Sequence, residues 1–359
     1  MHRFAVFSGF LGSGKTTAMI ALTQYYTRHF AKAAMISNDL GTGVMLADYK
    51  YACLSGCNAR QITDECICFC HDVLTERLDS LYADGCELVI SDIPAFGVGA
   101  LEHVYHGLTE NHPGRYDLAP FTVLIEPENL SRLRSGQAGD MGYILDAQLR
   151  EADLIVLSKC DLMDRLEREA ALVWLRQRYP WTRQLAVSAE TGEGMHALSL
   201  ALREKPASLR HPDIDYDGDG LQHAMASLCE YYLQYRAVVC CNRFDGNGYL
   251  SDLAEGIRNS VLAAGGELPH LKLLAWSADG DYGKVDILGT QRPLEQPRLF
   301  TRPCEDLAVI LNSSAVCPDR RFDRLISESI EKISDRWQLE LTCFRKDHFG
   351  LGGPDGDSD

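Results

Sequence analysis

The sequence predicts an α/β protein with a doubly wound, mostly parallel sheet, followed by a smaller α+β domain. Three observations support this fold class. Short apolar segments alternate with helical segments through residues 4–189. A glycine-rich loop directly follows the first apolar segment and opens a helical one. An acidic stretch with little to bury separates this region from a second alternation of strands and helices.

The apolar segments contain few alternating polar residues, which is typical of parallel strands covered on both faces. They lie at residues 4–9, 33–38, 87–92, 121–126, 154–159 and 184–189. Between them the apolar residues follow helical spacing, for example over residues 15–30 and 162–179. This order predicts successive βαβ units.

The stretch HPDIDYDGDG at residues 211–220 predicts a linker, because it holds four aspartates, two glycines and a proline. We therefore expect a first domain over residues 1–210, an acidic linker at 211–220, an α+β domain over 221–349 and a disordered acidic tail at 350–359. Strands of the second domain are expected at residues 235–244, 270–277, 284–289, 306–316 and 337–344, and helices at 251–266 and 320–336.

The composition limits the partners. With 51 acidic and 35 basic residues the net charge is -16, which argues against nucleic acid and anionic membrane surfaces. No apolar run approaches the roughly 20 residues of a membrane-spanning helix, and the N-terminus lacks the features of a signal peptide. We expect a cytoplasmic location, where the 13 cysteines would be thiols or metal ligands.

The sequence GFLGSGKT at residues 9–16 matches the phosphate-binding pattern G-x-x-x-x-G-K-[ST] in its required place between strand and helix. Such a loop turns backbone N–H groups toward the phosphates, while Lys15 neutralises phosphate oxygens and the Thr16 hydroxyl holds magnesium. The motif predicts a P-loop NTPase domain. Its expected nucleotide-binding residues are Gly9, Gly12, Ser13, Gly14, Lys15, Thr16 and Thr17.

A second motif indicates that the base is guanine, so the nucleotide would be GTP. Ser158, Lys159 and Asp161 hold the positions of the Asn-Lys-x-Asp motif, in which the aspartate accepts hydrogen bonds from guanine and the lysine packs on its ring. Serine replaces the asparagine here. Further along, VSAETG resembles the loop that completes a guanine site, through Ser188 and Ala189.

A cluster of possible metal ligands falls within residues 53–71. Its members are Cys53, Cys57, Cys66, Cys68, Cys70 and His71. Thiolates bind zinc and similar ions well, and alternate cysteines could converge on one ion if the segment is extended or turns sharply. Cys53 and Cys57 are either accessory ligands or loop residues, and His71 either binds or faces solvent. The spacing fits an iron–sulfur cluster or a C-x-x-C redox pair poorly.

In this order, GFLGSGKTT, ISNDLGTG, ECICFC, SKCDL and VSAETG resemble the CobW-type GTPases, relatives of the hydrogenase and urease nickel-insertion GTPases. The resemblance implies a metal-binding GTPase that delivers or senses zinc or cobalt, or that helps to mature metalloenzymes and corrinoid systems. It also implies an α+β C-terminal domain.

The resemblance extends to single residues. Asp39 stands where the family has the glutamate of Asn-Glu-x-Gly, near magnesium or the bound metal. Asp92, at the end of the third predicted strand, is the implied acidic residue at the magnesium, acting through water. Cys66 and Cys68 match the first two cysteines of Cys-x-Cys-Cys. In place of the third stands Phe69, with Cys70 one residue later. The implied catalytic residues are Lys15, Thr16 and Asp92, and the implied metal ligands are Thr16, Asp39, Cys66, Cys68 and Cys70.

Together these observations predict a slowly hydrolysing GTPase that couples nucleotide state to the delivery of zinc or cobalt to a client metalloenzyme. Slow, partner-dependent hydrolysis is expected because no glutamine is suitably placed to orient water. The alternative is a GTP-driven chaperone that loads or reactivates a corrinoid or other cofactor-dependent enzyme, with structural cysteines. A nucleotide kinase would need arginines over the phosphates, which the sequence does not display. The choice of metal and the formation of a homodimer stay open.

Overall fold

The computed structural model describes residues 2–139, 141–215, 219–226, 228–239 and 243–351. The chain divides into two compact units, Met1–Leu40 with Ser55–Leu221, and Gly41–Leu54 with Gln222–Asp359. The predicted tail at residues 350–359 lies outside the described residues from 352 onward, as do residues 216–218 of the predicted linker. None of the described helices combines the length and the apolar composition needed to cross a lipid bilayer.

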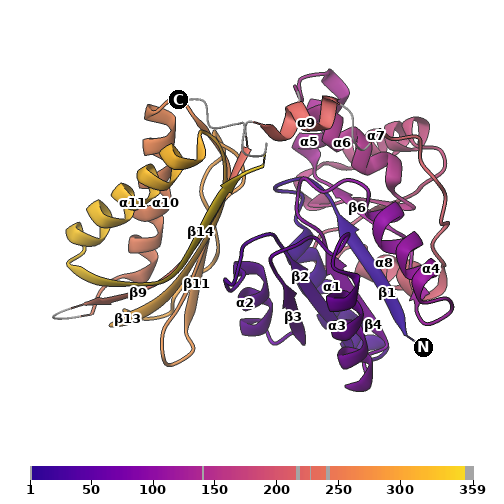
Figure 1. Cartoon of the computed structure of the whole chain (residues 1–359). Helices are drawn as coiled ribbons and strands as arrows, with labels where there is room; N and C mark the ends of the chain where they lie inside the picture. The colour runs from indigo at the N-terminus through magenta and orange to yellow at the C-terminus, as the bar shows by residue number, and fades with distance from the viewer. Residues whose placement is uncertain (1, 140, 216–218, 227, 240–242, 352–359) are drawn as a thin grey trace. The chain divides into compact units, whose positions relative to one another are not determined.

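The first unit contains a doubly wound α/β sheet, as the alternating apolar segments predicted (Figure 1). Its described strands pair in parallel in the order β3-β2-β4-β1-β6-β7-β8, with β5 also beside β1. The bounds are β1 (Arg3–Ser8), β2 (Ala33–Asn38), β3 (Ala59–Ile62), β4 (Leu88–Asp92), β5 (Asp117–Leu118), β6 (Thr122–Ile125), β7 (Leu154–Leu157) and β8 (Arg183–Ala186). Because the strand order reverses at β1, the loops after β1 and its neighbours meet at the place where such sheets bind ligands.

Helices cover this sheet, and several begin at side chains that satisfy their free N–H groups. Asp164 and Glu167 form a reciprocal capping pair at the start of α7, and the Glu126 carboxylate accepts from the first turn of α5. The helices of this unit are α1 (Lys15–His29), α3 (His71–Ala83), the π-helix η1 (Leu101–His106), α4 (Gly107–Asn111), α5 (Pro127–Ser135), α6 (Met141–Glu151), the 3₁₀ helix η2 (Cys160–Leu162), α7 (Arg165–Arg178) and α8 (Met195–Glu204). The chain passes to the second unit within α9 (Asp219–Ala226).

The second unit is built on an antiparallel sheet in the order β12-β11-β10-β13-β9-β14. Its elements are α2 (Ala47–Leu54), β9 (Leu228–Val239), α10 (Gly246–Ala263), β10 (Glu267–Trp276), β11 (Tyr282–Ile287), β12 (Glu295–Arg298), β13 (Asp306–Val316), α11 (Asp319–Arg336) and β14 (Leu339–Gly350). Figure 1 shows α10 and α11 together on one face of this sheet. Leu273 and Leu311 point into the core on that face, with Ile257 of α10 and Ile326 of α11.

The opposite face of the same sheet is covered by residues 41–54, which precede the rest of this unit by about half of the sequence. Alternation along the strands turns Leu274 and Ile310 to this side, where they pack against Ala47 at the start of α2. The Ala47 amide donates to the Asn312 side chain at 2.8 Å, and Lys272 pairs with Asp48 at 2.6 Å. The predicted domain division, with one linker at residues 211–220, did not include residues 41–54 in the second unit.

Other differences from the sequence expectations are local. Strand β9 begins at Leu228, seven residues before the expected start at 235, and α10 begins at Gly246 because Asp245 caps it. The short strands β3, β5 and β12 and the π-helix η1 were not expected. In contrast, β2 and β13 have the predicted bounds, since each contains a short apolar run, AAMI in β2 and LAVIL in β13.

Candidate nucleotide and metal site

The glycine-rich loop lies at the carboxyl end of β1 and leads into α1. A Cβ atom at Gly9 would lie 2.4 Å from the Leu124 carbonyl oxygen, and Gly14 has a φ of +82°, so both positions favour glycine. The Lys15 ammonium donates to the Gly9 carbonyl, across the loop. Thr16 is buried at the start of α1. Of the other predicted residues, Ser13 is buried, Gly12 has a left-handed φ and Thr17 is exposed.

The predicted base-recognition loops lie beside the phosphate loop. The Ser158 hydroxyl donates to the Ser13 carbonyl at 2.7 Å, so this serine joins the two loops. Lys159 has a left-handed φ of 50°, unusual for a residue other than glycine, and its Cε atom would be 3.9 Å from a Cβ at Gly14. Asp161 is exposed in η2.

The second base loop is adjacent because β8 pairs with β7. The Cys160 amide donates to the Val187 carbonyl at 3.3 Å, which holds the two loops together. Ser188 is buried, and its hydroxyl accepts from the Thr191 amide at 3.1 Å, closing the turn that presents Ala189. The structure therefore brings the predicted phosphate and base residues to one edge of the sheet.

One residue links the two acidic positions to the cysteines. The Asn38 amide donates to Asp92 Oδ1 at 2.8 Å. The Asn38 side chain accepts from the Ile67 amide at 2.9 Å and donates to the Glu65 carbonyl at 2.8 Å. Asp39 follows, and its amide donates to the Ile62 carbonyl at 3.2 Å. Asn38 is thus bonded both to Asp92 and to the backbone around the first cysteine.

The cysteine segment is a turn, not a strand. The Phe69 amide donates to the Cys66 carbonyl at 2.9 Å, and α3 starts directly afterwards at His71. The Cys70 thiol donates to the Cys66 carbonyl at 3.4 Å, whereas the Cys68 amide donates to Cys66 Sγ at 3.5 Å. Among the described residues, the sulfur atoms of Cys66, Cys68 and Cys70 do not gather within 4.8 Å of one another.

The thiols differ in acidity. A hydrogen bond from the Cys68 thiol lowers the pKa of Cys66, against the effects of burial and of the charges of Asp39 and Asp92. The same hydrogen bond raises the pKa of Cys68. Burial raises the pKa of Cys70 to about 11. The pKa values of the neighbouring Cys66 and Cys68 thiols are therefore shifted in opposite directions, and Cys66 is the more acidic of the two.

The remaining candidate ligands lie on other segments of the chain. Cys53 is exposed on α2, which belongs to the second unit. The Cys57 thiol donates to the Ile20 carbonyl at 3.8 Å. The His71 ring packs against the backbone of Gly107, where a Cβ would lie 2.2 Å from its Cε1 atom. Phe69, in the position of the expected third cysteine, is 72% exposed, and its ring lies 5.7 Å from that of His103.

Two buried polar residues of α6 were missed by the sequence analysis. The Gln148 side chain donates to the Ala95 carbonyl at 2.9 Å and to the Gly97 carbonyl at 3.0 Å, which fixes the segment after Asp92. Glu151 is fully buried, and its charge contributes to the raised pKa of Cys68. The available signal was their spacing of three on a helix face that is otherwise apolar.

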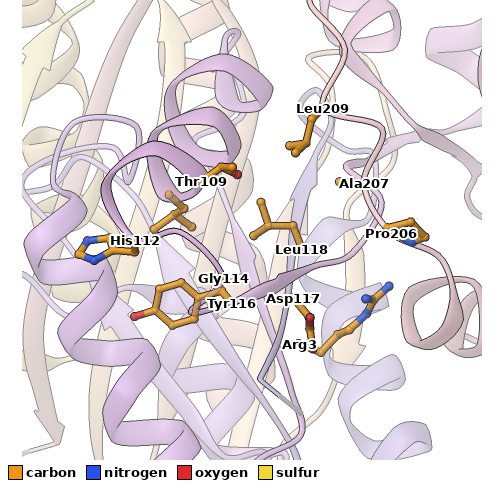
Figure 2. A pocket seen from close by; sticks show the side chains of 11 residues that line it. Arg3, Thr109, His112, Gly114, Tyr116, Asp117, Leu118, Pro206, Ala207 and Leu209 are labelled. Atoms are coloured by element: carbon orange, nitrogen blue, oxygen red, sulfur yellow. The ribbon is translucent and has the colours of Figure 1, made fainter.

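A cavity of about 230 Å³ lies away from these residues (Figure 2). Thr109 and His112 line one side of it, and Pro206, Ala207 and Leu209 line the other. No residue of the predicted nucleotide or metal site lines it.

The family model described as CobW/HypB/UreG, nucleotide-binding domain, matches residues 3–183. This chain belongs to the CobW/HypB/UreG family. The matched region of this family member holds the phosphate loop, Asp39, the cysteine turn, Asp92 and the Ser158 loop, and it ends before Ser188. The family resemblance inferred from the motifs is thereby confirmed.

The chain is similar to several characterised proteins and solved structures. The chain is 27% identical over 261 residues to the zinc chaperone YeiR of Escherichia coli (strain K12), covering 70% of this chain and 75% of that protein. Among solved structures, HypB from Helicobacter pylori in complex with nickel has a TM-score of 0.40 and 19% identity, covering 56% of this chain and 86% of that one. Zn(II)-bound YjiA GTPase from E. coli has a TM-score of 0.38 and 13% identity, covering 90% and 98%.

Proposed function

We propose that this chain is a GTP-hydrolysing metallochaperone that couples its nucleotide state to the binding and delivery of zinc or cobalt to a client metalloprotein. The observation that carries the proposal is the position of Asn38, which is hydrogen bonded both to Asp92 and to the turn that holds Cys66. The nucleotide and metal functions therefore share one residue.

On the nucleotide side, the residues fit GTP and magnesium. The close approach of Gly9 to the Leu124 carbonyl leaves no room for a side chain in the loop, and Lys15 neutralises the phosphate oxygens. Asp161 recognises guanine, while Ser158 keeps its loop against the phosphate loop. Thr16 and Asp92 offer oxygen ligands of the kind that magnesium prefers, the aspartate through water, and the ion neutralises charge on the phosphates.

On the metal side, Cys66 and Cys68 supply the thiolates, and Asp39 supplies a carboxylate directly after Asn38, whose side chain is hydrogen bonded on either side of Cys66. Two thiolates and a carboxylate suit a divalent thiophilic ion. A shift of Asp92 on GTP binding moves the Asn38 backbone, and the Asn38 side chain transmits it to Glu65 and Ile67 on either side of Cys66. Metal affinity and nucleotide affinity then change each other by the same factor.

The test is a titration of zinc, and separately of cobalt, into nucleotide-free, GDP-bound and GTP-analogue-bound protein, each with magnesium. We expect metal affinities that differ between the GDP and GTP-analogue states, and a GTPase rate that responds to the metal. Equal metal affinity in all three states contradicts the coupling. Capture of a corrinoid or other cofactor-dependent enzyme by the GTP-bound form, without such a difference, would instead support the alternative chaperone function.

A further inference from the structure

We infer that Glu102, His106 and His211 form a second divalent-metal site, one without cysteine. Their ligand atoms lie within 4.8 Å of one another, and they are the sole group of three or more such side chains found among the described residues. None of the three belongs to the nucleotide or cysteine sites described above. Two imidazoles and one carboxylate are a common ligand set for zinc and similar ions.

The separations are close to those of a bound ion. His211 Nδ1 lies 3.0 Å from Glu102 Oε2, and His106 Nε2 lies 3.9 Å from the same oxygen. Ligands of a tetrahedral zinc ion, at about 2.0–2.1 Å from the metal, are roughly 3.3 Å apart. Each pair is thus within about 1.5 Å of this spacing. The two imidazole rings are stacked with centroids 4.2 Å apart, so a rotation of the His211 ring is needed for both nitrogens to point at one ion.

The exposure of the His211 side chain permits that rotation. His106 is 14% exposed and anchored on η1, whereas Glu102 is 37% and His211 71% exposed. The partly exposed arrangement leaves the fourth position of the metal to water or to an incoming ligand, as in exchangeable sites. A ligand set without sulfur favours Zn²⁺ and Co²⁺ over softer ions such as Cu⁺.

The backbone on both sides of the site is held in an uncommon form. Glu102 and His106 lie one turn apart on a π-helix, a rare element often found at functional sites. His211 opens the acidic stretch after α8, two residues beyond Leu209, which has a left-handed φ of 50°. Arg210, between them, donates to the Ala152 carbonyl at 3.0 Å and fixes the start of this stretch.

A metal at this site would therefore pin the beginning of residues 211–220 to η1. The same helical segment contacts the cysteine turn on another side, through the ring pair of His103 and Phe69 and through Gly107 against His71. The second site and the cysteine turn thus adjoin one continuous helix, η1 with α4.

The decisive experiment removes the cysteine ligands and titrates Co²⁺ into the full-length Cys66→Ser, Cys68→Ser, Cys70→Ser variant. We expect about one equivalent to bind with visible d–d absorption and without a thiolate-to-cobalt charge-transfer band. Adding His106→Ala and His211→Ala should abolish this binding. His112→Ala, at the end of the same helical segment, is the matched control and should leave it unchanged.

A second measurement keeps the inference testable if the cysteine variant folds poorly. With all cysteines present, His106→Ala with His211→Ala should bind about one equivalent of zinc fewer than the wild type, with unchanged GDP affinity. Unchanged zinc stoichiometry in that variant, or cobalt binding that survives loss of both histidines, overturns the assignment. Neither result tests the cysteine site, because the thiolate-to-cobalt charge-transfer band of protein with its cysteines intact measures metal binding there separately.

Discussion

The Oδ1 atom of Asp92 accepts a hydrogen bond of 2.8 Å from the backbone amide of Asn38, which ties the end of β4 to the end of β2. Both residues are buried. The side chain of Asn38 is also hydrogen bonded to the backbone of Glu65 and Ile67, on either side of Cys66. Asn38 alone therefore connects the Asp92 carboxylate to the backbone of the cysteine turn.

Asn38→Ala should uncouple metal from nucleotide. The substitution keeps the backbone bond to Asp92 but removes the bonds to Glu65 and Ile67, which leaves buried backbone groups without a partner. We expect a loss of about 1–3 kcal/mol in the free energy of unfolding, and zinc affinities that no longer differ between GDP and a GTP analogue. Denaturant unfolding and zinc titration measure these effects. Asn58→Ala, which removes a part-buried side chain directly before β3, should keep the difference.

Ser158→Ala should weaken nucleotide binding. The hydroxyl holds the Ser13 carbonyl, and a hydrogen bond of this kind contributes about 0.5–1.5 kcal/mol, so GDP should bind roughly two- to tenfold more weakly. Titration with a fluorescent GDP analogue measures the change. Ser135→Ala, an exposed serine of α5, should have no effect, and an equal loss there would remove the role assigned to Ser158.

The three cysteines of the turn should not be equivalent. Cys66→Ser or Cys68→Ser should reduce zinc affinity by at least about a hundredfold, since each removes a thiolate ligand. Cys70→Ser should reduce it much less, because that thiol is bonded to the Cys66 carbonyl and burial raises its pKa to about 11. Competition with a chromophoric chelator gives the three affinities. Equal losses would show that all three sulfurs bind.

Gly107→Ala should destabilise the protein, although alanine normally stabilises a helix. The new Cβ would lie 2.2 Å from Cε1 of His71, so the ring at the start of α3 must move, at a cost of about 1–3 kcal/mol in unfolding free energy. In a His71→Ala background the same change should stabilise by up to about 1 kcal/mol. Urea unfolding of the four proteins completes this double-mutant cycle. Destabilisation by the same amount in both backgrounds would exclude the contact as its cause.

The sequence predicted those parts of the fold that depend on local pattern. Strands such as β2 and β13 contain short apolar runs, and the phosphate loop lies between a strand and a helix as its motif requires. Strand β3, with the sequence ARQI, was missed because its middle residues are polar and it pairs only with β2 at the sheet edge. The position of residues 41–54 depends on packing against strands more than 200 residues away, which no local period encodes.

In the candidate site, too, local motifs could be recognised in the sequence, whereas contacts between distant residues could not. Motif spacing singled out the candidate phosphate and base residues, because such functions need particular residue types at fixed offsets, and the structure brings these residues to one edge of the sheet. The path of the cysteine segment was not predictable, since the turn at Cys66 is fixed by the amide of Asn38, nearly 30 residues earlier. Gln148 acts on carbonyls 50 residues away, and the spatial meeting of His211 with Glu102 requires the folded chain.

Because residues 41–54 belong to the second unit, the protein cannot be divided into two fragments at the linker without separating this segment from its sheet. A fragment ending at residue 210 would contain this segment without the sheet that buries Val44, Leu46 and Ala47. These apolar side chains, which lie in the sequence between Asp39 and the cysteine turn, would then be exposed to solvent and prone to aggregation. The complementary fragment would expose Leu274 and Ile310 in turn. The two halves are therefore not independent modules, and chimeras with relatives must exchange residues 41–54 together with the C-terminal sheet.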